Sequence, residues 1–326
     1  MTGYTHNLSN RMKKKNLFFL ISTFFVLTLM VLYVRRNSES FKKILEISAL
    51  DFGILFLLHA AMMLVNAFIL ESYVRKLGKT ISFLDLLGVT ALNTFFNNIV
   101  TRSGVFVKGY LLNKIHNFPF TYFIFSALSF TLIQILGASV LGIVSLLFIY
   151  LHSGYFYFLI FLSYALIASV CLAVMNLPYK RGSRKDRIWI MTKARQLLES
   201  WNQVNKDKRL LGKLIFYSFL GYFIVAARLK YCFDITHAGA NYIQCLLFSS
   251  MTVLASIVSI TPEALGIREF LVAATYKAMN GNTVEAVVAT TMDRIISISS
   301  FFIVGCIFSV YFLLKFNNNS KKLESV

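Results

Sequence analysis

The sequence is poor in charge, in proline and in cysteine. Charged residues make up 14% of its 326 positions, and it has only 3 prolines and 4 cysteines. The cysteines are scattered through apolar runs without metal-ligand spacing, so we expect them to be small packing residues. The Gly-x-x-x-x-Gly-Lys-Ser/Thr motif of nucleotide hydrolases is absent. We therefore expect no metal, no cofactor and no ATP hydrolysis.

The sequence is rich in hydrophobic residues instead. Hydrophobic residues make up 57% of it, and 32 residues are phenylalanine. Runs such as 158–162 show no alternation of polarity, which argues against a membrane β-barrel. We predict an all-α, polytopic transmembrane helical bundle of about 6–8 spans, because a crossing helix needs roughly 20 apolar residues. The runs of this length are 17–34, 48–70, 120–151, 154–177, 211–234, 239–260 and 283–314.

The charge that is present is positive and clustered. The formal net charge is +19, and the longest polar stretch, 178–210, is strongly basic. The positive-inside rule places this linker and the N-terminus on the cytoplasmic side of a bacterial or archaeal inner membrane. Apolar residues between Ile190 and Val204 recur at helical spacing, which predicts an amphipathic helix on the inner membrane surface. It either contacts anionic head groups or is an ordinary cytoplasmic linker.

An internal repeat emerges at an offset of 162 residues. Each half carries a polar stripe along an apolar helix, and a break of small and polar residues follows it. The stripes line a cavity, or they form the hydrogen bonds between helices that are common in membranes. The matched positions are Thr90, Thr94, Asn97 and Gly104 in the first half and Thr252, Ser256, Ser259 and Gly266 in the second, with Asn93 also on the first stripe.

The breaks predict two helical hairpins. Because the N-terminus and the linker share one side, the segment 83–118 must enter and leave the membrane on the same side. We therefore divide the chain into an N-terminal membrane half, 1–177, and a C-terminal membrane half, 211–326, with a second hairpin at about 240–280. Two opposed re-entrant hairpins in an inverted repeat are typical of transporters that bind substrate near the midplane.

Few ionisable residues lie within these apolar segments, and such residues are usually paired or functional. A helix that begins inside the membrane directs its unpaired N–H groups at an anion. Two hypotheses apply to Arg268, Glu263, Glu269 and Arg294: they contact a substrate, or they neutralise one another as a structural network, and both can hold together. The lone polar residues His59 and Gln134 are expected to bond a neighbouring helix. The charged candidates are Arg102, Lys108, Glu263, Arg268, Glu269, Asp293 and Arg294.

The second break also carries a family pattern. It reads Thr261-Pro262-Glu263-Ala264-Leu265-Gly266-Ile267-Arg268-Glu269, with Arg294 further on. This resembles the Pro-x-x-x-Gly-x-Arg-Glu signature of the flippase-like domain of lysylphosphatidylglycerol synthases, over nearly the whole chain. In the first half, Gly104 and Lys108 match that family, whereas Val105 stands where an acid is usual. The resemblance implies an inner-membrane protein that moves a lipid or a lipid-linked glycan intermediate between leaflets.

The leading hypothesis is a flippase-like transporter. Its partners would be membrane lipids, anionic or polyprenyl-phosphate-linked, and not nucleic acid. We expect Arg268, Arg102 and the half-helix N-termini to recognise phosphate. The expected substrate-binding residues are Arg102, Gly104, Lys108, Pro262, Glu263, Gly266, Arg268, Glu269 and Arg294, and the expected cavity-lining residues are Thr90, Asn93, Thr94, Asn97, Thr252, Ser256 and Ser259.

Two alternatives stay open at this point. The chain could be a non-transporting membrane partner of a glycan or lipid assembly complex. Less favoured is an intramembrane enzyme that modifies lipid, because only Glu263 and Glu269 approach the acidic pair that a metal-dependent transferase needs. We therefore expect the chain not to be an enzyme.

Overall fold

The computed structural model describes residues 28, 32–33, 35–42, 44–99, 103–176, 201–202, 204–258, 261 and 264–324. Throughout these residues the regular secondary structure is helical, which confirms the predicted all-α class. Five helices are long and apolar enough to cross a membrane, and a shorter apolar helix accompanies them. The helices are α2 (Ser38–Lys42), α3 (Ala49–Lys76), α4 (Phe83–Ile99), α5 (Ser103–His116), α6 (Phe120–Ser153), α7 (Phe158–Asn176), α9 (Lys208–Ile235), α10 (Tyr242–Val258), α11 (Ile267–Ala278) and α12 (Thr283–Glu324).

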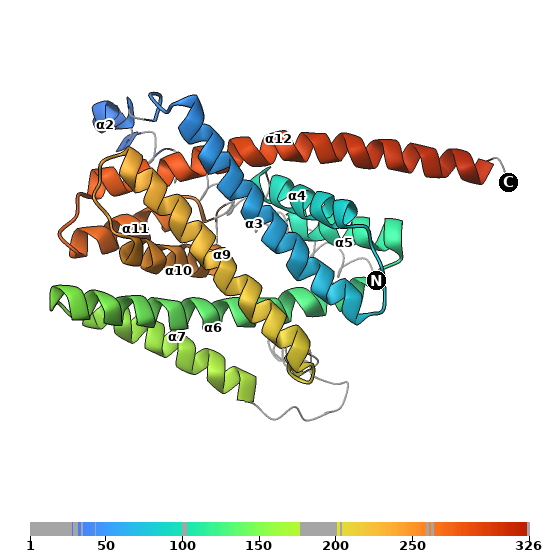
Figure 1. The fold of residues 1–326 in the computed structure, drawn as a ribbon, viewed down its shortest axis with the longest axis horizontal. Coiled ribbons are helices and arrows are strands. Elements are labelled where there is room, and N and C mark those ends of the chain that lie inside the picture. The colour runs from blue at the N-terminus through green and yellow to red at the C-terminus, as the bar shows by residue number, and fades with distance from the viewer. Residues whose placement is uncertain are drawn as a thin grey trace, which may run out of the picture.

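Helices α3 and α9 pack against each other at the centre of the bundle and run in opposite directions (Figure 1). At one end the Tyr231 hydroxyl of α9 donates to Asp51 Oδ1 of α3 over 2.7 Å. At the other end Lys76 Nζ of α3 lies 3.7 Å from Asp207 Oδ2, directly before α9. Contacts at both ends fix the antiparallel arrangement.

Asp207 also starts α9 as its N-cap. Its carboxylate accepts the N–H of Leu210 over 3.0 Å, which satisfies one of the donors left over at a helix start. This hydrogen bond, together with the nearby Lys76, lowers the pKa of the Asp207 carboxyl below its ordinary value. The Asp207 carboxylate therefore stays ionised at neutral pH. Its negative charge also interacts favourably with the positive end of the α9 dipole.

Two helical hairpins, α4–α5 and α10–α11, lie on either side of this central pair. In Figure 1 the base of α4–α5 is at the right-hand end of the bundle and the base of α10–α11 at the left-hand end, so their tips point toward each other. The two first legs have the same length, 17 residues. The second legs have 14 and 12 residues. The hairpins thus enter the bundle from opposite ends.

The order of elements repeats along the chain. A 28-residue helix, a hairpin and a long helix occur as α3, α4–α5, α6 and again as α9, α10–α11, α12. In the chain, helix α7 comes between the two units. It packs against α6, and much of its apolar surface is exposed. Because α7 adds one further pass along the bundle, α9 starts from the end at which α3 finished. The second unit is therefore inverted relative to the first.

The legs of the first hairpin approach closely at its tip. A Cβ placed on Gly104 would lie 1.7 Å from the backbone oxygen of Asn93, so no larger residue fits without moving the legs apart. The Gly104 N–H donates to Asn97 Oδ1 over 2.9 Å, and Ser103 Oγ donates to the carbonyl of Phe96 over 2.6 Å. The first bond satisfies an N–H at the start of α5 and the second a carbonyl in the last turn of α4, and groups at helix ends of this kind lack helical partners.

The basic linker predicted at 178–210 falls largely outside the described residues, and so does most of the predicted amphipathic helix. Its last residues are described. Val204 is buried in a cluster with Ile69 of α3, Ile133 of α6 and Leu214 of α9. The end of the linker is therefore packed into the bundle rather than lying free of it.

Candidate functional site

A buried ion network lies where α3, α9, α11 and α12 meet. The Asp293 carboxylate of α12 is fully buried and accepts from Arg228 of α9, with Nε 2.5 Å from Oδ1 and Nη2 3.3 Å from Oδ2. Arg268 of α11 also donates to Oδ2 of this carboxylate. One acid therefore joins two arginines from two different helices.

His59 completes this network from α3. Its Nδ1 lies 2.8 Å from Arg228 Nη1. Because a guanidinium only donates hydrogen bonds, Nδ1 is the acceptor and the ring proton sits on Nε2. Nε2 lies 3.8 Å from Asp293 Oδ1, beyond hydrogen-bond distance. His59 thus bonds a neighbouring helix, as the lone-polar interpretation of this residue predicts.

A second buried ion pair lies beside the first. Arg294 Nη1 of α12 donates to Glu269 Oε1 of α11 over 2.5 Å. The other oxygen of Glu269 accepts the N–H of Gly266 over 2.8 Å, at the start of α11. Gly266 has a φ of 82°, a left-handed conformation that glycine adopts without strain. Helix α11 is therefore held on α12 by two ion pairs. Of the predicted network, Arg294 and Glu269 pair with each other, whereas Arg268 pairs with Asp293, and Glu263 lies outside the described residues.

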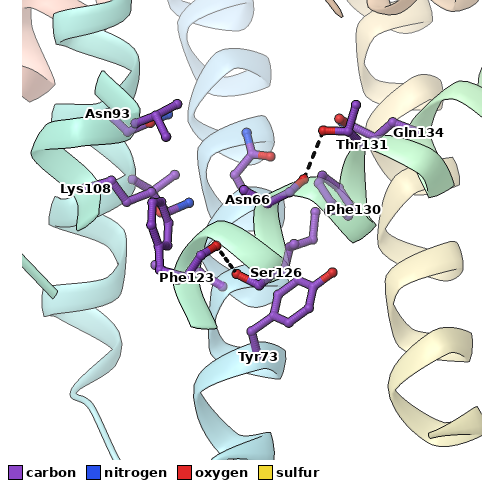
Figure 2. A pocket seen from close by; sticks show the side chains of 14 residues that line it. Asn66, Tyr73, Asn93, Lys108, Phe123, Ser126, Phe130, Thr131 and Gln134 are labelled. Atoms are coloured by element: carbon purple, nitrogen blue, oxygen red, sulfur yellow. Dashed lines mark hydrogen bonds between the residues drawn. The ribbon is translucent and has the colours of Figure 1, made fainter. Parts of the chain in front are cut away.

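A polar cavity of about 290 Å³ lies between α3, the first hairpin and α6. Figure 2 shows Lys108 and Asn93 on one wall, Asn66 at the centre and Gln134 with Thr131 on the far wall. Lys108 lies near the ring of Phe123, 6.0 Å from its centroid. The lining residues described in the structure include no aspartate and no glutamate.

The amides in this cavity carry unused hydrogen-bonding capacity. Hydroxyls on its wall are occupied locally: Ser126 donates to the Phe123 carbonyl over 2.7 Å, and Thr131 donates to the Ala127 carbonyl over 2.9 Å. Among the described residues, none bonds the side-chain amide of Asn66, Asn93 or Gln134. Such groups are expensive inside a membrane protein unless water or a ligand meets them.

The sequence-predicted residues fall into separate groups. Thr90, Asn93 and Lys108 come together in the cavity. Asn97 and Gly104 bond each other at the hairpin tip, and Thr94 Oγ1 donates to the Thr90 carbonyl over 3.2 Å. In α10, Thr252 and Ser256 donate to carbonyls of their own helix. Gly266, Arg268, Glu269 and Arg294 belong to the ion network, and Arg102, Ser259, Pro262 and Glu263 lie outside the described residues.

Some residues of the ion network and of the cavity were not predicted from the sequence to be functional. Arg228 lies within the apolar run 211–234, where a cation is a signal in itself. Asn66 lies in the apolar run 48–70, where a lone amide is the weaker form of the same signal. Gln134 was expected to bond a neighbouring helix through its side chain. Its side chain lines the cavity instead, and its backbone carbonyl accepts from the Tyr222 hydroxyl of α9.

A further charged cluster lies at the end of the bundle where α12 leaves it. Asp85 of α4 is buried and accepts from Lys315 Nζ of α12, over 2.6 Å at Oδ2 and 2.7 Å at Oδ1. The Tyr311 hydroxyl also donates to Asp85 Oδ1, over 2.9 Å, and His116 of α5 lies 3.3 Å away. This cluster ties both legs of the first hairpin to α12. In the described part of the chain, no group of His, Cys, Asp and Glu side chains is arranged to hold a metal.

Comparison with known proteins identifies a family for this chain. The sequence model of the family described as "Lysylphosphatidylglycerol synthase TM region" matches residues 16–305. No curated protein matches the chain.

Proposed function

Because the chain belongs to the lysylphosphatidylglycerol synthase TM region family, we propose that this multi-pass membrane protein is a flippase-like transporter. Its substrate is an anionic lipid or a lipid-linked glycan intermediate. The head group crosses through the polar interior while the hydrocarbon chains stay in the bilayer. The proposed role involves no chemical step and no enzyme activity of this chain.

The observation that most supports this proposal is the polar cavity beside the first hairpin. It lies inside a bundle whose outer surface is apolar, with residues such as Leu159, Leu162 and Leu166 exposed on α7. Charged or polar head groups cannot cross hydrocarbon without a path of polar partners. The first hairpin supplies polar partners for such a path, and a pair of opposed hairpins is the arrangement that transporters with inverted repeats use.

The proposal includes an orientation. Lys79 of the α3–α4 loop donates to the carbonyl of His116, the last residue of α5, over 3.2 Å. Lys315 pairs with Asp85 at the start of α4, and Lys76 at the end of α3 lies near Asp207, directly before α9, so both cations lie at the same end of the bundle as this hairpin base. Since cytoplasmic loops carry an excess of Lys and Arg, we propose that this end lies on the cytoplasmic side of the inner membrane.

A reversible cross-link between the first hairpin and α12 tests the function. A Cβ placed on Gly305 of α12 lies 2.8 Å from Phe95 Cβ of α4, so a Phe95→Cys, Gly305→Cys pair needs only a small shift to form a disulfide. The free cysteines Cys171, Cys232, Cys245 and Cys306 are first replaced by serine. Vesicles containing the protein then receive a fluorescent, tail-labelled phosphatidylglycerol, and extraction of the label from the outer leaflet by albumin, which leaves the disulfide oxidised, measures its exchange between leaflets.

We expect the reduced pair to exchange the lipid faster than empty vesicles, the oxidised pair to lose this activity, and reduction to restore it. The single variant Phe95→Cys, oxidised in the same way, controls for damage by the oxidant. Exchange no faster than in empty vesicles with the reduced protein would overturn the proposed transport. Equal rates in the oxidised and reduced pairs would show that the hairpin does not move against α12.

A further inference from the structure

The two halves of the chain differ at equivalent positions. With the offset of 162 residues, Asn66 of α3 corresponds to Arg228 of α9, and Thr131 of α6 corresponds to Asp293 of α12. In the second half these positions form the buried ion pair described above. In the first half they are neutral and line the polar cavity. The same arrangement thus occurs in two versions. In the second half an ion pair fills it, and we call this the filled version; in the first half a cavity takes its place, and we call this the open version.

Both versions contain a cation on the second leg of their hairpin. In the second half this cation is Arg268, and the Asp293 carboxylate neutralises it. In the first half it is Lys108, and within the described chain no carboxylate pairs with it or lines its cavity. The Lys108 side chain is half-buried, and a cation inside an apolar bundle without a counter-charge is unfavourable. The open version therefore lacks the negative charge that the filled version supplies internally.

The cavity suits an oxyanion with several acceptor oxygens. The Lys108 ammonium is a compact charge of the kind that binds phosphate, and the amides of Asn66, Asn93 and Gln134 offer further N–H donors from three different helices. A planar carboxylate would be served better by the fork of an arginine, which the described lining does not contain. The volume of about 290 Å³ is at the lower end of small-ligand pockets and fits a head group rather than a whole lipid.

We propose that the cavity between α3, α4, α5 and α6 is a phosphate-binding site, in which Lys108 pairs with the phosphate of a head group and Asn66, Asn93 and Gln134 donate hydrogen bonds to it. The inference rests on the proposed function for the source of the phosphate, a lipid. The binding itself requires only the cavity. Arg268, by contrast, is engaged with Asp293 and positions α11.

Direct binding by the purified full chain in mild detergent tests the site. The probes are inorganic phosphate, short-chain phosphatidic acid and short-chain diacylglycerol, with titration calorimetry as the readout. We expect wild type to bind phosphatidic acid, and Lys108→Gln to weaken this binding at least tenfold. Lys108→Arg should retain it. Lys114→Gln is the matched control, because Lys114 lies on the same helix but is exposed.

A second variant distinguishes a loss of binding from a loss of folding. Asn93→Asp adds a carboxylate on the wall beside Lys108 with almost no change in volume (Figure 2). It imitates the second half, so we expect it to abolish phosphatidic acid binding while the thermal midpoint in detergent stays at or above that of wild type. Equal affinity of wild type, Lys108→Gln and Asn93→Asp, or no binding of either phosphate probe by wild type, would overturn the site.

The remaining outcomes identify the source of the phosphate. Binding of phosphatidic acid but not of inorganic phosphate assigns a lipid head group, and equal binding of both assigns a free anion. Binding of diacylglycerol as tight as that of phosphatidic acid would also overturn the site, because the phosphate would then contribute nothing. Since no transport is measured, phosphate binding without lipid exchange in vesicles would refute the proposed function alone.

Discussion

At the scale of single residues, the buried charges are the most demanding feature of this chain. Asp293 pairs with two arginines, and a histidine accepts a further N–H of one of them. Burying such a set is not strongly stabilising in itself, because each charge loses its hydration. Breaking it is costly, since the remaining partners stay buried without compensation.

This asymmetry predicts the effect of Asp293→Asn. The substitution keeps the shape of the side chain but leaves Arg228 and Arg268 without a counter-charge, so we expect a loss of about 3–5 kcal/mol in the free energy of unfolding. Thermal unfolding in detergent measures it. Asp234→Asn is the matched control, because Asp234 pairs with Lys230 on an exposed helix face. That pair should contribute about 0–1 kcal/mol, so equal effects of the two substitutions would contradict the network.

At the scale of elements, the hairpins depend on small residues where two helices touch. At the tip of α4–α5 the missing side chain of Gly104 lets α5 lie directly on the backbone of Asn93. At the tip of α10–α11, Gly266 instead supplies a left-handed turn into α11. The aligned glycines therefore serve different local purposes in the two halves.

Gly104→Ala is expected to separate the legs of the first hairpin. The added Cβ would lie 1.7 Å from a backbone oxygen, and overpacking of this kind costs at least about 1–3 kcal/mol. Gly53→Ala in α3 is the control, because its Cβ meets nothing within 4 Å and alanine favours a helix by up to about 1 kcal/mol. Thermal midpoints of the two variants should therefore move in opposite directions. A Gly104→Ala midpoint at or above that of wild type would contradict the close approach.

At the scale of the whole molecule, α7 decides the symmetry. It adds a pass between two otherwise similar units, and the second unit is inverted as a result. Without this helix, α9 would start from the opposite end and could not pair antiparallel with α3 through its two end contacts.

This arrangement predicts which loops share a side of the membrane. We expect Lys114→Cys, at the base of α4–α5, to react with an impermeant maleimide from the cytoplasmic side. Asn282→Cys, before α12, and Tyr155→Cys, between α6 and α7, should react only from the other side. All three positions are exposed, and the native cysteines are removed first. Labelling of Lys114→Cys and Asn282→Cys from the same side would be incompatible with opposed hairpins.

The sequence by itself determined the helical membrane class and the positions of five long apolar helices. Of the other two predicted runs, 239–260 forms the shorter helix α10, and 17–34 lies almost wholly outside the described residues. Apolar runs of bilayer length leave the chain no other way to satisfy its backbone, and the breaks at Gly104 and Gly266 interrupt those runs visibly. The charged residues Arg268, Glu269 and Arg294 stood out for the same reason, since a bilayer makes any charge conspicuous.

Only the tertiary structure decided which charges are already neutralised. Arg268 and Lys108 look alike in the sequence, as cations shortly after a break. One faces Asp293, which lies 25 residues away on α12, and the other faces a cavity lined by neutral groups. Pairing of this kind depends on which helices become neighbours in space, and that depends on the whole bundle, so no local pattern of residues reveals it.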